Sequence, residues 1–308
     1  MRQPWTKNDI PDLTGKVIIV TGGNSGLGYE AVRLFTENGA EVILASRSLE
    51  RGEQAKEKIL QLSPPGKIVV MELDLSDLGS VHRFCSSFST NYAKLDILLN
   101  NAGIMTTPYH LTLDGFEGQL GTNHLGHFAL TGILWDILSR THGSRIVNVS
   151  SLAHKSGTFD FNHLQFDGDQ GYTPLGAYGR SKLANLLFTY ELQRRIEKSG
   201  KTPMAVAAHP GVSDTDLGRH LKHKVLYKLL RPLVGLFAQD PKQGTLPEVR
   251  AAVDPQVTGA SYYGPSGRGE LKGHPILVNS NAASHDLEDA RRLWELSEEL
   301  TGISFLSE

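Results

Sequence analysis

The chain has 308 residues, of which 39% are hydrophobic and 21% are charged, as in an ordinary globular protein. Its 31 basic and 33 acidic residues leave a net charge of −2, which argues against a nucleic-acid partner because such a partner requires a basic excess. The lone cysteine, Cys85, excludes an intrachain disulfide and any site with two thiolates. No apolar run is long enough to span a bilayer, and the polar N-terminus lacks a signal-peptide pattern, so we expect a cytoplasmic, reducing compartment.

Short β-branched runs alternate with helical patterns along the chain. Strands are expected at 17–20, 41–45, 68–73, 96–99, 145–149 and 204–208, and helices at 29–38, 50–62, 77–92, 112–140 and 176–198. Continuous apolar strands between helices are typical of buried parallel strands joined by right-handed crossovers. The sequence therefore predicts an α/β fold, a single-domain doubly wound parallel sheet (Rossmann fold) over 1–308 with helices on both faces. Ligands of such a fold bind at the carboxyl ends of the strands.

The first expected strand runs directly into a glycine-rich turn. The residues assigned to the cofactor here are Gly22, Asn24, Ser25, Gly26, Leu27 and Gly28. Glycines at this spacing let the backbone turn sharply and approach a pyrophosphate, and the following helix presents free N–H groups to that anion. The alternative is a turn without a ligand. Because this turn ends a buried strand and opens a helix, it favours nucleotide binding.

The ends of the next three strands suggest which nucleotide is bound. The second strand ends in Ser46 and Arg47 where an NAD site usually has an acid, and a guanidinium suits a 2′-phosphate. This favours NADP over NAD, unless Arg47 only lies on a solvated loop. Asp74 and Leu75 end the third strand and could meet the adenine, although Asp74 is almost as typical of a helix N-cap. The small residues Asn101, Ala102 and Gly103 follow the fourth strand and permit close approach of the cofactor.

The fifth strand and the helix after it carry the expected chemistry. The strand ends in Ser150 and Ser151, at the edge of the sheet where the site should lie. Downstream, Tyr178 and Lys182 are four residues apart in a helical run and so share one helix face. A neighbouring ammonium favours the phenolate, and we expect Lys182 to lower the pKa of Tyr178 from its usual value near 10. Taken alone, this pair also fits a solvated helix surface.

Together these pieces resemble the short-chain dehydrogenase/reductase family. The matching segments are Thr21 to Gly28, Asp74, Asn100 to Gly103, Asn123, Ser151, Tyr178, Lys182 and Pro210-Gly211, in that order and over most of the chain. The resemblance implies a catalytic tetrad of Asn123, Ser151, Tyr178 and Lys182. It also assigns Tyr178, Lys182, Pro210, Gly211 and Val212 to the cofactor, which would be NADP with NADPH preferred over NADH. Ser150 would be structural.

Finer features resemble the retinol dehydrogenase-like branch of that family. These are the run Asn123 to Phe128, the run Ser181 to Asn185, and His209 before Pro210. Ser151 and Tyr178 are 27 residues apart, about twice the usual separation, and this branch carries such an insertion. The insertion, 155–173, is expected near the mouth of the site. The related protochlorophyllide reductases are disfavoured because they place a cysteine near the site, whereas Cys85 fits helix packing.

The resemblance implies an NADP(H)-dependent oxidoreductase that interconverts a carbonyl and an alcohol on a hydrophobic small molecule. Tyr178 would exchange the proton, Ser151 would bond the substrate oxygen, Lys182 would lower the phenol pKa and hold the ribose, and Asn123 would position a relay water. The alternative is a catalytically silent NADP-binding redox sensor or partner-docking protein. A pure sensor has no need of the four groups.

Three other features complete the sequence-based expectations. The histidine pairs 124/127 and 220/223 lack an acid or a cysteine to complete a zinc site, so no metal is expected, and His127 is assigned to helix packing near the cofactor. The apolar and basic stretch 216–239, within a predicted substrate lid at 213–245, suits a lid, peripheral membrane contact, or both. A C-terminal extension is expected at 264–308, with residues 262–265 following the last strand. Its amphipathic helix at 286–300 would cover the site or an oligomer surface such as a homodimer interface.

Overall fold

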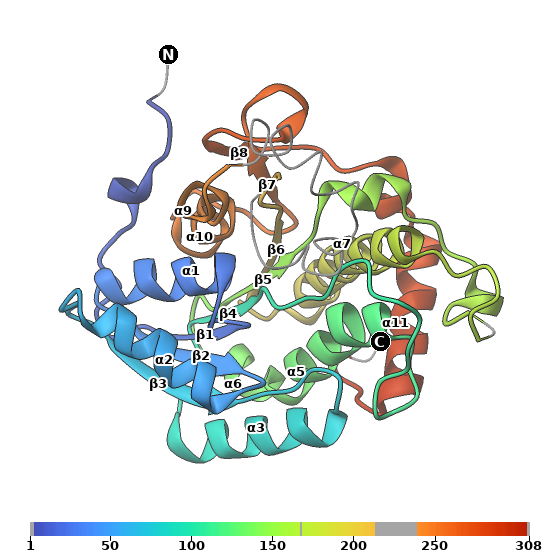
Figure 1. Ribbon diagram of the computed structural model, residues 1–308, viewed down its shortest axis with the longest axis horizontal. Coiled ribbons are helices and arrows are strands. Elements are labelled where there is room, and N and C mark those ends of the chain that lie inside the picture. Colours follow the sequence, from blue (N-terminus) through green and yellow to red (C-terminus); the bar gives the residue numbers. More distant parts are fainter. Residues whose placement is uncertain (1–2, 167, 213–238, 307–308) are drawn as a thin grey trace.

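A computed structural model describes residues 3–166, 168–212 and 239–306 of the chain. Its centre is an eight-stranded sheet with the order β3-β2-β1-β4-β5-β6-β7-β8 (Figure 1). The strands are β1 (Val17–Thr21), β2 (Glu41–Ser46), β3 (Lys67–Glu72), β4 (Ile97–Asn100), β5 (Arg145–Val149), β6 (Met204–Ala208), β7 (Tyr262–Pro265) and β8 (Pro275–Leu277). All pairings are parallel except that of β8 with β7. The predicted single-domain Rossmann fold is confirmed.

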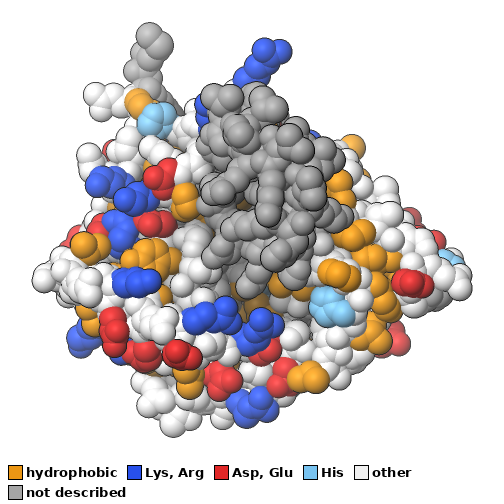
Figure 2. Space-filling view, in the orientation of Figure 1, with side chains coloured by type: hydrophobic (Ala, Val, Ile, Leu, Met, Phe, Trp, Pro, Cys, Tyr) orange, Lys and Arg blue, Asp and Glu red, His pale blue; other side chains and the backbone are white. Residues whose placement is uncertain are grey.

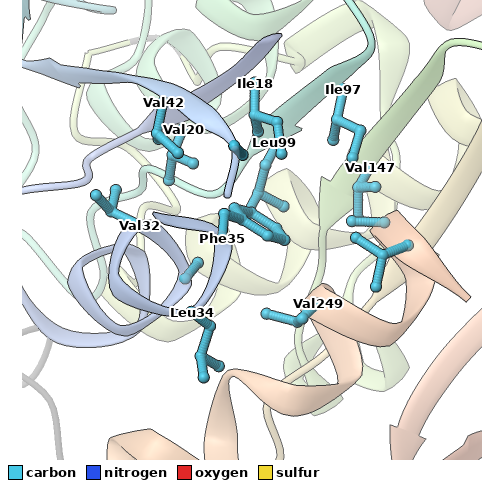
Figure 3. Packing of buried hydrophobic residues seen from close by; sticks show 14 of the residues in the cluster. Ile18, Val20, Val32, Leu34, Phe35, Val42, Ile97, Leu99, Val147 and Val249 are labelled. Atoms are coloured by element: carbon cyan, nitrogen blue, oxygen red, sulfur yellow. The ribbon is translucent and has the colours of Figure 1, made fainter. Parts of the chain in front are cut away.

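The central strands are mainly apolar because both faces of the sheet are buried. In β1, Ile18 and Val20 belong to one core, whereas Val17 and Ile19 belong to the other. Figure 3 shows the first core, where Phe35 points toward the sheet. Alternation of side chains between the two faces therefore feeds two hydrophobic cores from one strand.

Helices cover both faces of the sheet. The first core is closed by α1 (Gly26–Glu37), α2 (Leu49–Leu60) and α10 (Leu246–Val253), and α9 (Pro241–Gly244) contacts α1. The second core is closed by α3 (Leu78–Asn91), α5 (Gly126–Ile133), α6 (Trp135–Arg140), α7 (Pro174–Ser199) and α11 (Leu287–Thr301). The long helix α7 has clear boundaries, because Thr173 caps its first turn and Gly200 ends it in the left-handed conformation. Of the helices that the structure describes, none is both long and apolar enough to cross a membrane.

Short one-turn helices fill the connections between the larger elements. They are η1 (Lys7–Asp9), η3 (Leu152–Ser156), η4 (Phe161–His163), η6 (Arg268–Glu270) and η7 (Ala282–His285). Before α5 lie α4 (Gly118–Leu120) and the π-helical turn η2 (Gly121–Leu125). The expectation of one helix over 112–140 is therefore wrong in detail. The helical segment begins only at Gly118 and contains the π-helical turn η2. Before it, Leu111 pairs with Glu117 in a short antiparallel bridge.

The C-terminal third also departs from the expectations. Residues Tyr262–Pro265 form the strand β7 itself rather than following the last strand, and β8 adds an antiparallel edge that its three residues did not reveal. Part of the predicted extension at 264–308 thus belongs to the sheet. Helix α11 is present as expected, but Trp294 is its central packed side chain, in contact with Phe128 and Phe305, whereas Leu300 is half-buried. The predicted lid lies outside the described residues except for 239–245.

Candidate active site

The carboxyl ends of the central strands line a cavity of about 680 Å³. Most residues assigned to the cofactor from sequence line it, namely Gly22, Asn24, Ser25, Gly26, Leu27, Gly28, Ser46, Arg47, Asp74, Leu75, Asn101, Ala102, Gly103, Tyr178, Lys182 and Pro210. Gly211 and Val212 do not line it, and neither do Asn123 and Ser151. The fold therefore gathers these residues from six sequence regions at the edge where a doubly wound sheet binds its ligands.

The glycine turn between β1 and α1 forms one wall of the cavity and leaves no room for larger residues. Gly22 has a φ of +68°, which disfavours any residue with a side chain. A Cβ atom on Gly28 would lie 2.4 Å from the Gly22 carbonyl oxygen and 2.5 Å from Asn101 Nδ2. Ser25, the N-cap residue of α1, makes no side-chain cap bond, so the helix N-terminus keeps its backbone N–H groups for another acceptor. This arrangement fits the pyrophosphate of a dinucleotide.

A buried network behind the turn ties β1 to the loop after β4. Thr21 Oγ1 accepts hydrogen bonds from the backbone N–H groups of Asn101 and Ala102, both at 2.9 Å, and lies 2.9 Å from His127 Nε2. Burial lowers the pKa of His127 to about 4, so the ring is neutral. Its Nδ1 donates to the Asn123 carbonyl oxygen at 3.0 Å, and Nε2 accepts from the Thr21 hydroxyl. His127 thus packs in α5 as expected and also holds the cavity wall.

Asn123 supports the site from behind the cavity wall. Its Oδ1 accepts from the Ile104 backbone N–H at 2.8 Å, and its Nδ2 donates to the Ile104 carbonyl at 3.0 Å and to Ser181 Oγ at 2.9 Å. A Cβ on Gly103 would meet Asn123 Oδ1 at 3.1 Å. The side chain is therefore fully engaged in shaping the loop 101–104. Its place in the π-helical turn η2 is a feature that the helical pattern of the sequence did not reveal.

Tyr178 and Lys182 lie side by side on the buried face of α7. Lys182 Nζ donates to the carbonyl of Val149, the last residue of β5, at 2.9 Å, and lies 5.8 Å from the centre of the Tyr178 ring. Burial lowers the pKa of Lys182 to about 8 and raises the pKa of Tyr178 to about 12, whereas a hydrogen bond with the Ser151 side chain lowers the latter. The expected lowering of the phenol pKa by Lys182 is wrong for the protein's own groups, because desolvation of the ring dominates.

The two serines at the end of β5 have different surroundings. Ser150 Oγ donates to the Lys182 carbonyl at 2.8 Å, which fits its predicted structural role. Ser151 is the N-cap of η3, and its Oγ accepts from the Ala153 backbone N–H at 3.2 Å while interacting with Tyr178. The second serine is therefore the one that shares the phenol's surroundings.

The opposite end of the cavity is basic. Arg47 lines it together with Arg51 and Lys58 of α2, and among the described residues none of these three side chains has an ion pair. Arg51 and Lys58 were missed from sequence, although the lining positions 51, 54, 55 and 58 follow the i, i+3, i+4, i+7 spacing of one helix face. Other lining residues that were not assigned to the site from sequence are Tyr29, Leu73, Ile104, Met105, Thr122 and Val149, and Thr21 of the matching segment also lines the cavity.

Asp74 has a local role that neither sequence interpretation included. Its Oδ1 accepts from the backbone N–H of Ser76 at 3.0 Å and from Ser76 Oγ at 2.6 Å, which closes a tight turn. The N-cap residue of the next helix, α3, is Asp77 instead. Asp74 still lines the cavity, so its carboxylate is available to it.

Gly211 and Val212 connect β6 to the loop before β8 rather than lining the cavity. Gly211 has a φ of +67°, and a Cβ there would lie 2.4 Å from the Leu271 carbonyl oxygen, to which Val212 N–H donates at 2.9 Å. Val212 O accepts from the Gln239 backbone N–H at 2.8 Å, so these two described residues lie side by side here. Pro210 remains at the cavity and accepts from Gln239 Nε2 at 2.7 Å.

The insertion at 155–173 folds against the N-terminal half of α7. Tyr172 donates from its hydroxyl to the Thr107 carbonyl at 2.9 Å, and Arg180 lies 4.2 Å over the ring of Phe166. Arg180 also donates to the carbonyls of Thr158, His163 and Leu164. Figure 2 shows hydrophobic side chains gathered on this side of the molecule, to the right of the view. The insertion is thus anchored beside the helix that carries Tyr178.

The histidines offer no metal site in the part of the chain that the structure describes. No group of three His, Cys, Asp or Glu side chains there is arranged to hold a metal ion. His124 is buried, and its Nε2 lies 2.8 Å from Ser297 Oγ of α11. The pair 220/223 lies outside the described residues.

Comparison with known proteins agrees with this arrangement. A family model described as short chain dehydrogenase matches residues 16–163. Human retinol dehydrogenase 11 is 38% identical over 293 residues, which cover 94% of this chain and 87% of that protein. Human retinol dehydrogenase 14 is 39% identical, with 94% and 88% covered. A crystal structure of an uncharacterized protein from Mycobacterium paratuberculosis has 39% identity and a TM-score of 0.81 over 98% of this chain and 99% of that one.

The relatives thus match the chain over nearly its whole length, and the cavity lies where the fold places a nicotinamide dinucleotide. The chain therefore belongs to the short-chain dehydrogenase/reductase family, in its retinol dehydrogenase-like branch, and is an oxidoreductase that interconverts alcohols and carbonyl compounds with a nicotinamide cofactor.

Proposed function

We propose that this protein is an NADP(H)-dependent reductase or dehydrogenase of hydrophobic carbonyl compounds and alcohols. The observation that carries the proposal is one cavity with a basic group of side chains at one end and the buried Tyr178–Lys182 pair at the other. The first end suits a nucleotide phosphate, and the second suits proton transfer. A single dinucleotide would connect them.

The basic end supports NADP over NAD. The strand β2 ends in Ser46, whose hydroxyl donates to the Ser48 carbonyl at 3.0 Å, so no carboxylate occupies the usual ribose-binding position. Arg47 and Arg51 flank this position with guanidinium groups that match the geometry of a phosphate. Lys58 adds a third positive charge. The cavity acid Asp74 would lie toward the adenine.

The other end supports acid–base chemistry by the protein's own groups. When bound, the nicotinamide ring supplies or accepts the hydride. Tyr178 then donates a proton to the substrate oxygen during reduction and removes it during oxidation, and the Ser151 hydroxyl bonds the same oxygen. In the cofactor complex, the positive charges of Lys182 and of an oxidised nicotinamide would offset part of the desolvation that raises the pKa of the Tyr178 phenol. Asn123 holds the loop 101–104 in the shape that the cofactor requires.

The substrate class follows from the relatives and from the surroundings of the site. The curated relatives described above are retinol dehydrogenases, and a retinoid is a long apolar alcohol or aldehyde. The aromatic side chains of the insertion, among them Phe166 and Tyr172, lie beside α7. We therefore propose a lipid-like aldehyde or ketone as substrate, with peripheral membrane contact through 216–239 as a separate proposal.

A substrate panel with both cofactors tests the function. Apolar aldehydes of increasing chain length, including retinal, are incubated with NADPH or NADH, and cofactor oxidation is followed at 340 nm, the absorbance of the reduced nicotinamide. We expect turnover with NADPH that Tyr178→Phe abolishes. Equal turnover by wild type and variant would refute the mechanism. NADPH binding without turnover of any substrate would instead favour the redox-sensor alternative.

A further inference from the structure

A buried carboxyl group lies close to the site without any role in the mechanism above. Glu248 belongs to the first turn of α10 and is 0% exposed. Neither of its side-chain oxygens has a hydrogen-bond partner among the described residues. An orphaned buried carboxyl group destabilises a fold, since its lost hydration is not replaced. Such a group calls for an explanation other than stability.

The packing of α10 places this carboxyl group near the carboxyl end of β5. The helix packs on β4, β5, β6, β7, β8, α1 and α9. One turn before Glu248, Thr245 Oγ1 donates to the Leu27 carbonyl of the glycine turn at 3.2 Å. The next residue, Val249, belongs to the same hydrophobic core as Val147 of β5 (Figure 3). Glu248 is thereby held between the dinucleotide turn and the strand that ends at the active site.

Lys182 approaches the same strand end from the opposite face of the sheet. Its Nζ donates to the carbonyl of Val149, the last residue of β5, and its side chain is buried. The two side chains interact electrostatically: Lys182 is the charged group that affects the Glu248 carboxyl, and Glu248 is the charged group that affects the Lys182 ammonium. Burial raises the pKa of Glu248 to about 8 and lowers the pKa of Lys182 to about 8, and each charge opposes the shift of the other.

Other titratable groups lie next to Lys182 and on the elements packed against α10. Next to Lys182, burial keeps His127 neutral and the Tyr178 phenol protonated. The charged or titratable groups on α10, at its C-cap and on the elements packed against it are Tyr29, Arg33 with Glu30 and Glu37, Lys242, Arg145, Arg250 with Asp254, Tyr262 and Tyr263. His209 pairs with Glu270 just beyond the end of β6.

We propose that Glu248 is a positioning residue for the reaction, which acts through Lys182 by providing the buried negative charge that keeps its ammonium group protonated. The inference rests on the proposed role of Lys182. As pH rises, the two groups titrate as a coupled pair. The pair can therefore lose its first proton while Lys182 stays positively charged. Without the carboxylate, desolvation acts unopposed and Lys182 loses its proton at a lower pH.

The pH dependence of turnover tests this in the complete enzyme. In Glu248→Gln, we expect the alkaline limb of the kcat profile with NADPH to move to lower pH by about one unit, with little change at pH 6. At a pH above the alkaline limb of both the wild type and the variant, a shift of one unit corresponds to an approximately tenfold lower kcat in the variant. Glu191→Gln is the matched control, because Glu191 is a buried carboxylate on α7 that pairs with Arg195. An unchanged alkaline limb in Glu248→Gln, or the same movement in the control, would overturn the proposal.

A second readout separates this inference from the function on which it rests. The Cε signal of ¹³C-labelled Lys182, identified by its loss in Lys182→Met, is titrated by NMR in the protein without substrate. We expect a lower midpoint in Glu248→Gln than in wild type, and equal midpoints would reject the Glu248 proposal whatever the activity. Full activity of Lys182→Met would instead reject the proposed function. For Glu248→Met we expect the kcat shift together with an unchanged or higher Tm, whereas a lower Tm with an unmoved profile would indicate a purely structural role.

Discussion

Replacement of Arg51 by alanine tests the basic end of the cavity most directly. The residue lies in the first turns of α2, lines the cavity, and has no ion pair among the described residues. Its removal therefore breaks no ion pair among the described residues. Lys56 is a matched control on the same helix, because it pairs with Glu53 at 3.0 Å and does not line the cavity.

The expected magnitude follows from the exposure of the side chain. A hydrogen bond to a charged group contributes about 1.5–3 kcal/mol when shielded from water, and solvent exposure of Arg51 reduces this to about 1 kcal/mol. One kilocalorie per mole corresponds to about a fivefold rise in the Kd of NADPH, since 1.4 kcal/mol is tenfold. NADH has no 2′-phosphate, so its Kd should not change. The double variant Arg47→Ala/Arg51→Ala should approach a thirtyfold loss for NADPH alone.

Fluorescence titration of each cofactor, at low and at high salt, measures the effect. The NADPH penalty should shrink at high salt because exposed charges are screened within about a Debye length. Lys56→Ala should leave both Kd values at the wild-type level. Equal losses for NADPH and NADH, or an NADPH loss in Lys56→Ala as large as in Arg51→Ala, would refute the assignment of this end to the 2′-phosphate.

Three further predictions concern the rest of the site. Tyr178→Phe should lower kcat by about 10²–10⁴-fold while NADPH still titrates normally, and a loss of cofactor binding instead would contradict its role as the proton donor. Gly28→Ala should abolish cofactor binding and lower Tm, because its Cβ would meet the Gly22 carbonyl at 2.4 Å, whereas Gly79→Ala in α3 meets only side-chain atoms and should raise stability by about 0.5–1 kcal/mol. Burial lowers the pKa of His124 to about 3, so the unfolded chain binds its proton first and stability should fall by about 1.4 kcal/mol per pH unit below about 6.5. Urea unfolding of His124→Gln should show a shallower slope between pH 7 and pH 5, and an unchanged slope would count against this origin.

Much of the fold could be predicted from local patterns. The strands from β1 to β6 are centred on short apolar runs, and the helices between them have an apolar face, because helices cover both faces of the sheet. The glycine turn was equally predictable from sequence, since a side chain on Gly28 would collide with the Gly22 carbonyl of the same turn. By contrast, β8 has three residues with two exposed apolar side chains, and the π-turn at 121–125 resembles an ordinary helix in sequence. Short edge strands and π-turns depend on their neighbours for stability.

The sequence by itself determined which chemical groups are present and their order, from the glycine turn to Tyr178 and Lys182. Only the tertiary structure decided their environment. Burial moves the Tyr178 pKa away from neutrality rather than toward it, α2 adds Arg51 to the basic end, and α10 brings Glu248 into the field of Lys182 from the far side of the sheet. Desolvation and charge interactions depend on distances between residues that are far apart in the chain, so no local pattern encodes them.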